Sequence, residues 1–280
     1  MMANNDSVYH YTSIAGLLGM LNEYSDDNQN ITKWATHGLF LNDPSEFSYG
    51  AKLLDPMIKL IEEKLSIPEK ERIGGCLSLD KLIKTQGTLT HQYGVPYISS
   101  FTYAKDCLPM WGMYADNGKG VMIEFDINEL KKLDVFDVNC KYCSTKYDLI
   151  QHYEIIKKVY ETLRKRYVPE HMEDKLRRCQ GVLLFSMHLS AFLSPTIKHA
   201  SYKYEQEFRL AVQSEAEPLF RERDGVIIPY IHTYIPISTV KSIYIGPNAN
   251  YDFVKSSLEI LFAHKRIKIN IMKSEVPYRG

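Results

Sequence analysis

Short strand-like segments separated by long helical stretches limit the folds that this 280-residue chain can adopt. The segments VYHYTSI, VPYISSFTY and VMIEFD (residues 8–14, 95–103 and 121–126) are rich in β-branched and aromatic residues, which is typical of strands. A long charged helical pattern occupies residues 146–190 before the strands resume. This alternation predicts a single α+β domain over residues 1–280, with a helical insertion at about residues 146–200.

Further helices and strands are expected between these segments. Apolar residues at helical spacing predict a helix after Ser13, which is placed to cap it, and Pro109 predicts the start of a short helix. Two less regular patterns predict a helix over residues 45–65, interrupted near Pro56, and another over residues 69–93. The remaining expected elements are strands in THGLFLNDPSEF, GVIIPYI, VKSIYIGPNAN and RIKINIM, and a helix in YDFVKSSLEILFAH.

The balance of positive and negative residues limits which kinds of molecule the whole chain could attract by its charge. Lysine plus arginine equals aspartate plus glutamate at 34 each, so no global field attracts nucleic acid or anionic lipid. The N-terminus lacks a basic segment followed by an apolar run, and no stretch approaches about 18 uninterrupted apolar residues. We therefore expect no signal peptide, no membrane partner and a cytoplasmic location.

The five cysteines are scattered along the chain, and their odd count argues against a disulfide framework. Cys140 and Cys143 form a lone C-x-x-C with no second pair at zinc-ribbon spacing. We expect free structural thiols and no metal site.

The segment YKYEQEFRL places Glu205 and Glu207 two residues apart in a pattern that predicts a strand. Alternate side chains of a strand share a face, so both glutamates are expected on one side, together with Lys203 and Arg209. One interpretation is a solvated edge on which opposite charges form a ladder. The other is a pair of carboxylates on a rigid element that faces a cleft.

Several other polar residues lie where packing alone does not require them. His10 lies between tyrosines in the first strand, and Asn42 and Asp43 begin a turn directly after an apolar segment. Trp111 and Tyr114 are one helical turn apart and therefore share a face. Each also has a structural interpretation: His10 as a core histidine, Asn42 and Asp43 as a turn that starts a helix, and Trp111 and Tyr114 as core aromatic residues.

Taken in order, these motifs resemble a widespread bacterial family known as domain of unknown function twenty-nine seventy-one. The resemblance covers nearly the whole chain and is carried by YHYTSIAGLLGML, FLNDPSEFSYG, YISSFTYAKDCLPMWGMYADNGKGVMIEFD, YKYEQEFRLAV and IYIGPNA. The family name implies no activity. A bacterial accessory protein in toxin or phage-defence settings is the expectation by analogy.

A more distant resemblance, to the ADP-ribosyltransferase superfamily of the His-Tyr-Glu type, implies a chemistry. The pattern consists of HYT in the first strand, a helix immediately after it, a middle strand that ends in Ser/Thr and a late strand with E-x-E. The resemblance implies a split mixed or antiparallel sheet that binds NAD in its cleft. NAD is then the substrate, and the acceptor of the ADP-ribose, a protein or a nucleic acid, is left open.

The resemblance also implies roles for residues of the first and second motifs. His10 is expected to bind a ribose hydroxyl, and Thr12 to support the nicotinamide amide from the same strand. The aromatic residue that stacks on nicotinamide is expected to be Tyr114, with Tyr103 and Phe101 as alternatives.

The third motif places the catalytic glutamate at Glu207. Breaking the nicotinamide–ribose bond develops oxocarbenium-like charge, which a carboxylate on the 2′-hydroxyl stabilises. Glu205 is expected to activate the nucleophile, and Arg209 to hold Glu207 ionised or to meet a pyrophosphate. The other candidates are Trp111 in NAD binding and Asn42, Asp43 and Glu46 in support of the cleft.

Two alternatives remain open. A metal-dependent nuclease or hydrolase would take its ligands from His10, Asp43, Glu46, Glu205 and Glu207. No H-E-x-x-H or clustered D-x-D spacing supports it. A non-catalytic module would bind a nucleotide or a peptide in the same cleft without breaking a bond.

Overall fold

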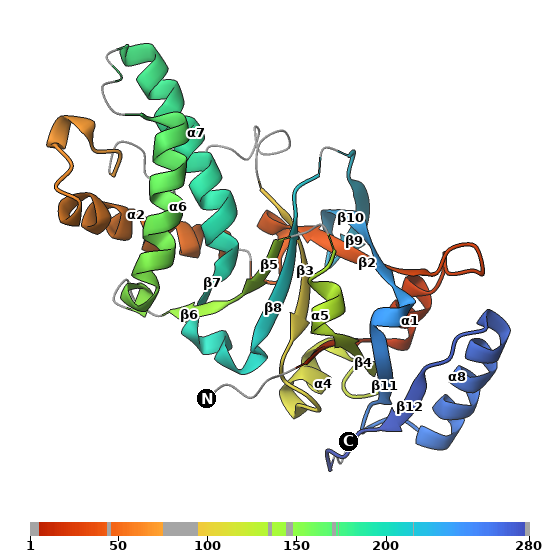
Figure 1. Ribbon diagram of the computed structural model, residues 1–280. Coiled ribbons are helices and arrows are strands. Elements are labelled where there is room, and N and C mark those ends of the chain that lie inside the picture. Colours follow the sequence, from red (N-terminus) through yellow and green to blue (C-terminus); the bar gives the residue numbers. More distant parts are fainter. Residues whose placement is uncertain are drawn as a thin grey trace.

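The computed structural model describes residues 6–43, 46–74, 95–133, 136–143, 148–169, 172, 174–214 and 216–277. Its described elements form a mixed α+β fold, which confirms the predicted class (Figure 1). The strands are β1 (Ser7–Thr12), β2 (Asn30–His37), β3 (Tyr97–Thr102), β4 (Val121–Asp126), β5 (Phe136–Asn139), β6 (Lys141–Cys143), β7 (Ile197–His199), β8 (Glu207–Val212), β9 (Leu219–Arg223), β10 (Val226–Pro236), β11 (Val240–Ile245) and β12 (Asn270–Lys273). The helices are α1 (Ile14–Met20), α2 (Glu46–Lys64), α4 (Leu108–Tyr114), α5 (Ile127–Leu130), α6 (Tyr153–Tyr167), α7 (Lys175–Leu193) and α8 (Tyr251–Lys265).

One ten-stranded sheet dominates the described part of the chain. Eight strands follow the order β12-β11-β4-β1-β3-β2-β10-β9, while β8 pairs with β3 and β5 pairs with β8. Within this sheet the pairings are antiparallel except for the parallel pair of β11 and β12. β6 and β7 form a separate parallel pair.

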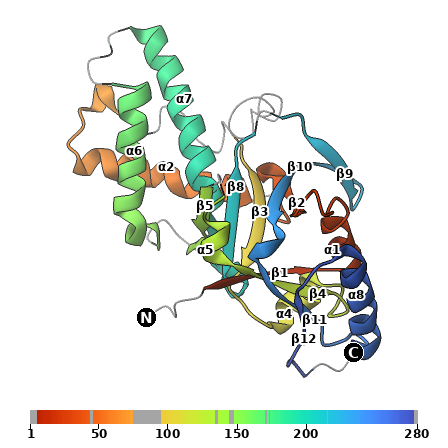
Figure 2. The ribbon, with the colours of Figure 1, turned by 45° about the vertical axis from the view of Figure 1, so that its right-hand side comes forward.

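The large sheet divides at β3. Along one edge β3 pairs with β8 over its full length. Along the other edge β2 pairs only with Tyr97 and Ile98, and β1 only with Thr102. The middle of β3 therefore has no ladder partner from β1 or β2, and Figure 2 shows β1 running across the direction of β3 and β8. This split opens the space in which the candidate site lies.

Helices cover the sheet at its β11–β12 end and form a separate lobe at the other end (Figure 1). α1 and α8 pack their apolar side chains on the sheet in one core cluster. α2, α6 and α7, which we call the helical lobe, share a second core cluster. At Gly50, α2 comes so close to the backbone of Ser194 that a Cβ would lie 2.8 Å from its Cα. No helix in the described ranges is both long enough and apolar enough to cross a membrane.

Local sequence signals explain several of these elements. Ser13 is the N-cap of α1 and accepts a hydrogen bond from the Gly16 N–H, as expected. Pro109 lies in the first turn of α4, also as expected. α2 continues through Pro56, so the predicted interruption is wrong. A proline removes one helical hydrogen bond, and the buried Leu54 and Met57 beside it pack into the lobe's core and hold the helix together.

The segment predicted as one strand over residues 202–210 divides in two. Ala200–Glu205 is a 3-10 helix, Gln206 is left-handed with φ of 43°, and β8 begins only at Glu207. A left-handed residue breaks the alternation of side chains, so Glu205 does not lie in the strand. The interpretation as a solvated ladder is wrong as well, because Glu205, Glu207 and Arg209 are all buried.

Other strand predictions also need correction. β2 begins at Asn30, upstream of the strand expected in THGLFLNDPSEF, and Gly38–Phe40 is a 3-10 helix. The last strand is β12, which begins at Asn270 instead of Arg266, since Arg266 is the left-handed C-cap of α8. β5, β6, β7 and β9 were not predicted. The helix expected over residues 69–93 lies mostly outside the described residues.

Gly120 tests the packing of β1 against the turn that precedes β4. A Cβ at Gly120 would lie 2.2 Å from the Thr12 carbonyl oxygen and 3.0 Å from that of Ala115. Since both contacts are backbone atoms, Gly120→Ala should lower the free energy of unfolding by about 2 kcal/mol or more. The matched control is Gly112→Ala in α4, where nothing lies within 4 Å and alanine favours the helix. Urea unfolding midpoints that are equal for the two variants would contradict this packing.

Candidate active site

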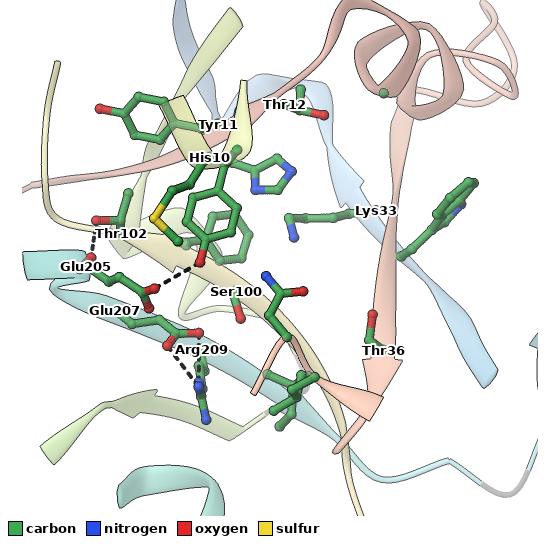
Figure 3. A pocket seen from close by; sticks show the side chains of 18 of the residues that line it. His10, Tyr11, Thr12, Lys33, Thr36, Ser100, Thr102, Glu205, Glu207 and Arg209 are labelled. Atoms are coloured by element: carbon green, nitrogen blue, oxygen red, sulfur yellow. Dashed lines mark hydrogen bonds and ion pairs between the residues drawn. The ribbon is translucent and has the colours of Figure 1, made fainter. Parts of the chain in front are cut away.

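A cavity of about 500 Å³ occupies the split in the sheet (Figure 3). This volume lies within the range of roughly 300–1,000 Å³ that is typical of small-molecule sites. Residues of β1, β2, β3, α1, α4 and the start of β8 line it. Figure 3 shows Glu205, Glu207 and Arg209 on one side and Lys33 on the opposite side.

Two buried carboxylates and two buried cations form one wall of the cavity. Lys198 of β7 donates to both Glu205 and Glu207, and its Nζ lies 2.8 Å from the Glu207 Oε2. Arg209 grips Glu207 with two hydrogen bonds, of 2.9 Å from Nε and 2.8 Å from Nη2. Although burial opposes ionisation, Arg209 and Lys198 hold the pKa of Glu207 at about 2. Glu207 is therefore a carboxylate at any physiological pH.

A chain of hydrogen bonds runs from Glu205 to the rim of the cavity. The Tyr114 hydroxyl donates to the Glu205 Oε1 at 2.9 Å, and the Asn42 side chain bonds to the same hydroxyl. Arg223 of β9 donates from Nη1 to the Asn42 Oδ1 at 2.7 Å. Burial and the Glu205 charge raise the pKa of Tyr114, so this hydroxyl stays protonated. The loop that carries Asn42 thus fixes the Tyr114 ring and, through it, Glu205.

Lys33 and His10 form the opposite side of the cavity. Lys33 is 5% exposed, and its Nζ lies 4.8 Å from the centre of the Phe101 ring. No described residue forms an ion pair or a hydrogen bond with its ammonium group. Burial lowers the pKa of Lys33 to about 7, although the Glu207 charge opposes this shift. Burial and the Lys33 charge hold the pKa of His10 well below its usual value, so the imidazole is neutral. Its ring also bonds to the Ser100 backbone, which orients it.

Most of the residues that the sequence singled out lie around this cavity. Those that line it are His10, Thr12, Asn42, Asp43, Phe101, Tyr114, Glu205, Glu207 and Arg209. Tyr103, an alternative for the aromatic residue of the second motif, packs on the sheet core and does not line the cavity. The Glu46 side chain lies outside the described residues.

The prediction that Trp111 takes part in NAD binding is wrong, because Trp111 does not line the cavity. It is fully buried, it packs edge-on against Tyr11 at 4.9 Å, and its indole N–H donates to Asp106 at 2.7 Å. Trp111 and Tyr114 do lie one turn apart on α4, but α4 sits between the core and the cavity. Trp111 therefore faces the core, whereas Tyr114 reaches the cavity.

Sequence reasoning missed four cations at the cavity: Lys33, Lys198, Arg221 and Arg223. Lys33 follows Thr32 in a strand that was not predicted, and Lys198 lies in the three-residue β7. The one available signal for Lys33 was its place in NITKWATH, a segment with several β-branched and aromatic residues, because a lysine that is buried in a strand needs a reason.

The donors at the cavity do not form an obvious metal site. Among the described residues, no group of three or more histidine, cysteine, aspartate or glutamate side chains is placed to hold a metal ion. The carboxylate oxygens of Glu205 and Glu207 accept hydrogen bonds from Lys198, Tyr114 and Arg209 instead. These contacts argue against the metal-dependent alternative.

The ion pairs of Glu207 should appear in the acid stability of the protein. Because the pKa of Glu207 in the folded state is below its usual value of 4.5, the carboxylate stabilises the fold above about pH 4.5. This contribution, on the order of 3 kcal/mol, is lost as the pH falls to about 2. In Glu207→Gln the free energy of unfolding should therefore change less steeply than in the wild type over this range. The control is Glu129→Gln, an exposed partner of Lys132, and an unchanged slope in Glu207→Gln would refute the assignment.

Residues 110–210 match the model of a family described as "Protein of unknown function (DUF2971)". This stretch holds Tyr114, Lys198, Glu205, Glu207 and Arg209. Neither a curated protein nor a solved structure matches the chain. Over residues 110–210 the match supports the resemblance to DUF2971 that the sequence motifs indicate.

Proposed function

We propose that this protein is an NAD-dependent ADP-ribosyltransferase, or an NAD glycohydrolase when water is the acceptor. The observation that carries the proposal is that His10 of β1, Tyr114 of α4 and the two glutamates at the start of β8 line one cavity. These residues are far apart in the sequence, and the resemblance to ADP-ribosyltransferases requires all of them at one NAD site. The split of the sheet at β3 supports the same assignment.

The charges around the cavity suggest the orientation of NAD. A buried ammonium costs free energy unless a negative charge accompanies it, so Lys33 favours the pyrophosphate of the ligand. The nicotinamide ribose then lies at the opposite wall, beside Glu205 and Glu207. The ring of Tyr114, held by Asn42 and Glu205, is in place to stack on nicotinamide.

The contacts favour a division of roles between the glutamates that differs from the one the motif implies. Glu207 faces two cations, so its charge is balanced before any ligand binds. Glu205 shares Lys198 and otherwise accepts from a neutral tyrosine hydroxyl. We therefore assign to Glu205 the contact with the reacting ribose, and to Glu207 the positioning of Lys198.

The reaction then needs only groups of this chain. The bond between nicotinamide and the ribose C1′ breaks, its electron pair leaves with nicotinamide, and positive charge develops on the ribose. The Glu205 carboxylate stabilises that charge where it appears. The nucleophile, water or an acceptor, adds to C1′ and gives its proton to Glu205.

The proposal is tested by incubating the protein with NAD and measuring released nicotinamide, with and without a chelator. Release that the chelator does not affect supports the proposal. Release or cleavage that requires a divalent metal would favour a metal-dependent hydrolase. Binding of NAD without any release would favour a non-catalytic binding module.

The substitution Glu205→Gln should reduce the rate of nicotinamide release without unfolding the protein. The amide keeps the size of the side chain and removes the charge, so NAD should still bind while nicotinamide release falls by about 100- to 1,000-fold. The control is again Glu129→Gln, because Glu129 is an exposed residue of α5, and this variant should release nicotinamide at the wild-type rate. A Glu205→Gln variant with wild-type turnover would remove Glu205 from the mechanism.

Lys33→Met should bind NAD more weakly and yet be at least as stable as the wild type. A hydrogen bond to a charged group contributes about 1.5–3 kcal/mol, so affinity should fall by roughly tenfold or more. The same substitution removes a buried charge that has no described anionic partner, which should not lower the urea unfolding midpoint. The control is the exposed Lys119→Met, which should change neither quantity. A Lys33→Met variant that is less stable and binds NAD normally would show that the ammonium has a structural role instead.

A further inference from the structure

The outer face of β2 and β10 carries a row of aromatic side chains, Trp34, Tyr230, His232 and Tyr234, which we call the aromatic face. The last three alternate along β10 and share a side, and Trp34 lies opposite His232 in the ladder. Successive ring centres from Trp34 to Tyr234 are 4.9, 5.8 and 6.2 Å apart. Trp34 is 41% exposed and Tyr234 53% exposed, so the row presents planar apolar surface to the solvent.

Arginines of β9 add positive charge to this face. Leu219 lies opposite Tyr230 in the ladder, so Arg221 and Arg223 share its side. The guanidinium of Arg221 lies 5.0 Å from the centre of the Trp34 ring and 5.7 Å from that of Tyr230. The buried Nε of Arg221 has no hydrogen-bond partner within the described ranges. A cation beside exposed rings favours a ligand that is both planar and anionic.

Trp34 joins the aromatic face to the candidate active site. It lines both the main cavity and a second cavity of about 310 Å³. The second cavity is lined by Gly19 and Asn22 on the α1 side and by His232 on the sheet. A ligand that extends along the aromatic face therefore reaches the NAD cavity directly.

We propose that the aromatic face binds single-stranded nucleic acid and presents one of its bases to the main cavity as the acceptor. Bases stack on aromatic rings whatever the sequence, and Arg221, which lies beside the Trp34 and Tyr230 rings, would meet a phosphate between them. The net charge of zero and the Glu23 carboxylate 3.8 Å from His232 leave no broad positive surface for a duplex. An unpaired strand is the form of nucleic acid that offers its bases to such a face.

The acceptor role rests on the proposed function, whereas the binding does not. In the transfer, a nitrogen or oxygen of the base forms the bond to the ribose C1′, and nicotinamide leaves with the electron pair. The proton of the attacking base passes to Glu205. Binding is therefore measured without NAD, so that a failure of either proposal can be recognised separately.

The two tryptophans of the chain make binding measurable by fluorescence. Trp34 is partly exposed and Trp111 is fully buried, so a stacked base should quench Trp34 and leave the emission of Trp111. The full chain is titrated with DNA and RNA oligonucleotides of one sequence, each as single strand and as duplex, and with adenosine monophosphate. We expect quenching by single-stranded DNA or RNA, and the difference between the two identifies the natural strand.

Variants locate the binding on the aromatic face. Trp34→Leu should weaken binding by about fivefold or more, as for the loss of one base–aromatic stack, measured by fluorescence polarisation of a labelled strand. The matched control is Phe253→Leu, which should leave the affinity unchanged, because this 75% exposed aromatic residue belongs to α8 and not to β2 or β10. Arg221→Gln should reduce the slope of log affinity against log salt by about 0.7, as for one phosphate contact on a single strand.

Three results would overturn the proposal. Adenosine monophosphate that quenches as strongly as a single strand would make the aromatic face part of the NAD site. Equal binding of duplex and single strand would indicate contacts to the backbone alone. Normal binding by Trp34→Leu, or no binding of any strand by the wild type, would exclude the aromatic face as a nucleic-acid site.

Discussion

The ion pair of Lys198 with two glutamates is the interaction on which the candidate site depends. Glu205 and Glu207 are two residues apart and both buried, so their carboxylates repel each other unless a cation lies between them. Lys198 contacts both, and Arg209 completes the hydrogen bonding of Glu207 with a two-point contact. Buried charges are tolerated only when their hydrogen bonds are complete, and here every carboxylate oxygen has a donor.

The two sides of the cavity differ in how their charges are compensated. The carboxylate wall is balanced internally, whereas the Lys33 side has no described counter-ion. This asymmetry gives a ligand a direction, because an anionic group is stabilised at one wall and an electron-poor sugar at the other. The neutral His10, on the same side as Lys33, donates and accepts hydrogen bonds without adding charge.

The sequence predicted the parts of the fold that local patterns determine. Ser13 and Pro109 begin helices where their capping chemistry requires, and the strands around His10 and Phe101 lie near their expected positions. β2 was misplaced because the polar residues Asn30 and Lys33 obscure its apolar alternation. Gln206 was read as an ordinary strand residue, since nothing local reveals a left-handed conformation.

The sequence predicted both glutamates and Arg209 of the candidate site, but not its lysines. E-x-E and HYT are compact motifs, so Glu205, Glu207 and His10 could be found by spacing alone. Lys198 and Lys33 come from separate elements that meet these motifs only through long-range packing. Trp111 was predicted at the site and lies in the core instead. Helical spacing shows that two residues share a face of a helix, but not what that face packs against.

The close contact of α2 with Ser194 ties the helical lobe to the chemistry of the cavity. The chain passes from α7 through Ser194 directly into β7, which carries Lys198. The position of Lys198 therefore depends on how α2 packs against Ser194, so a substitution that repacks the lobe would also shift the cation between the two glutamates.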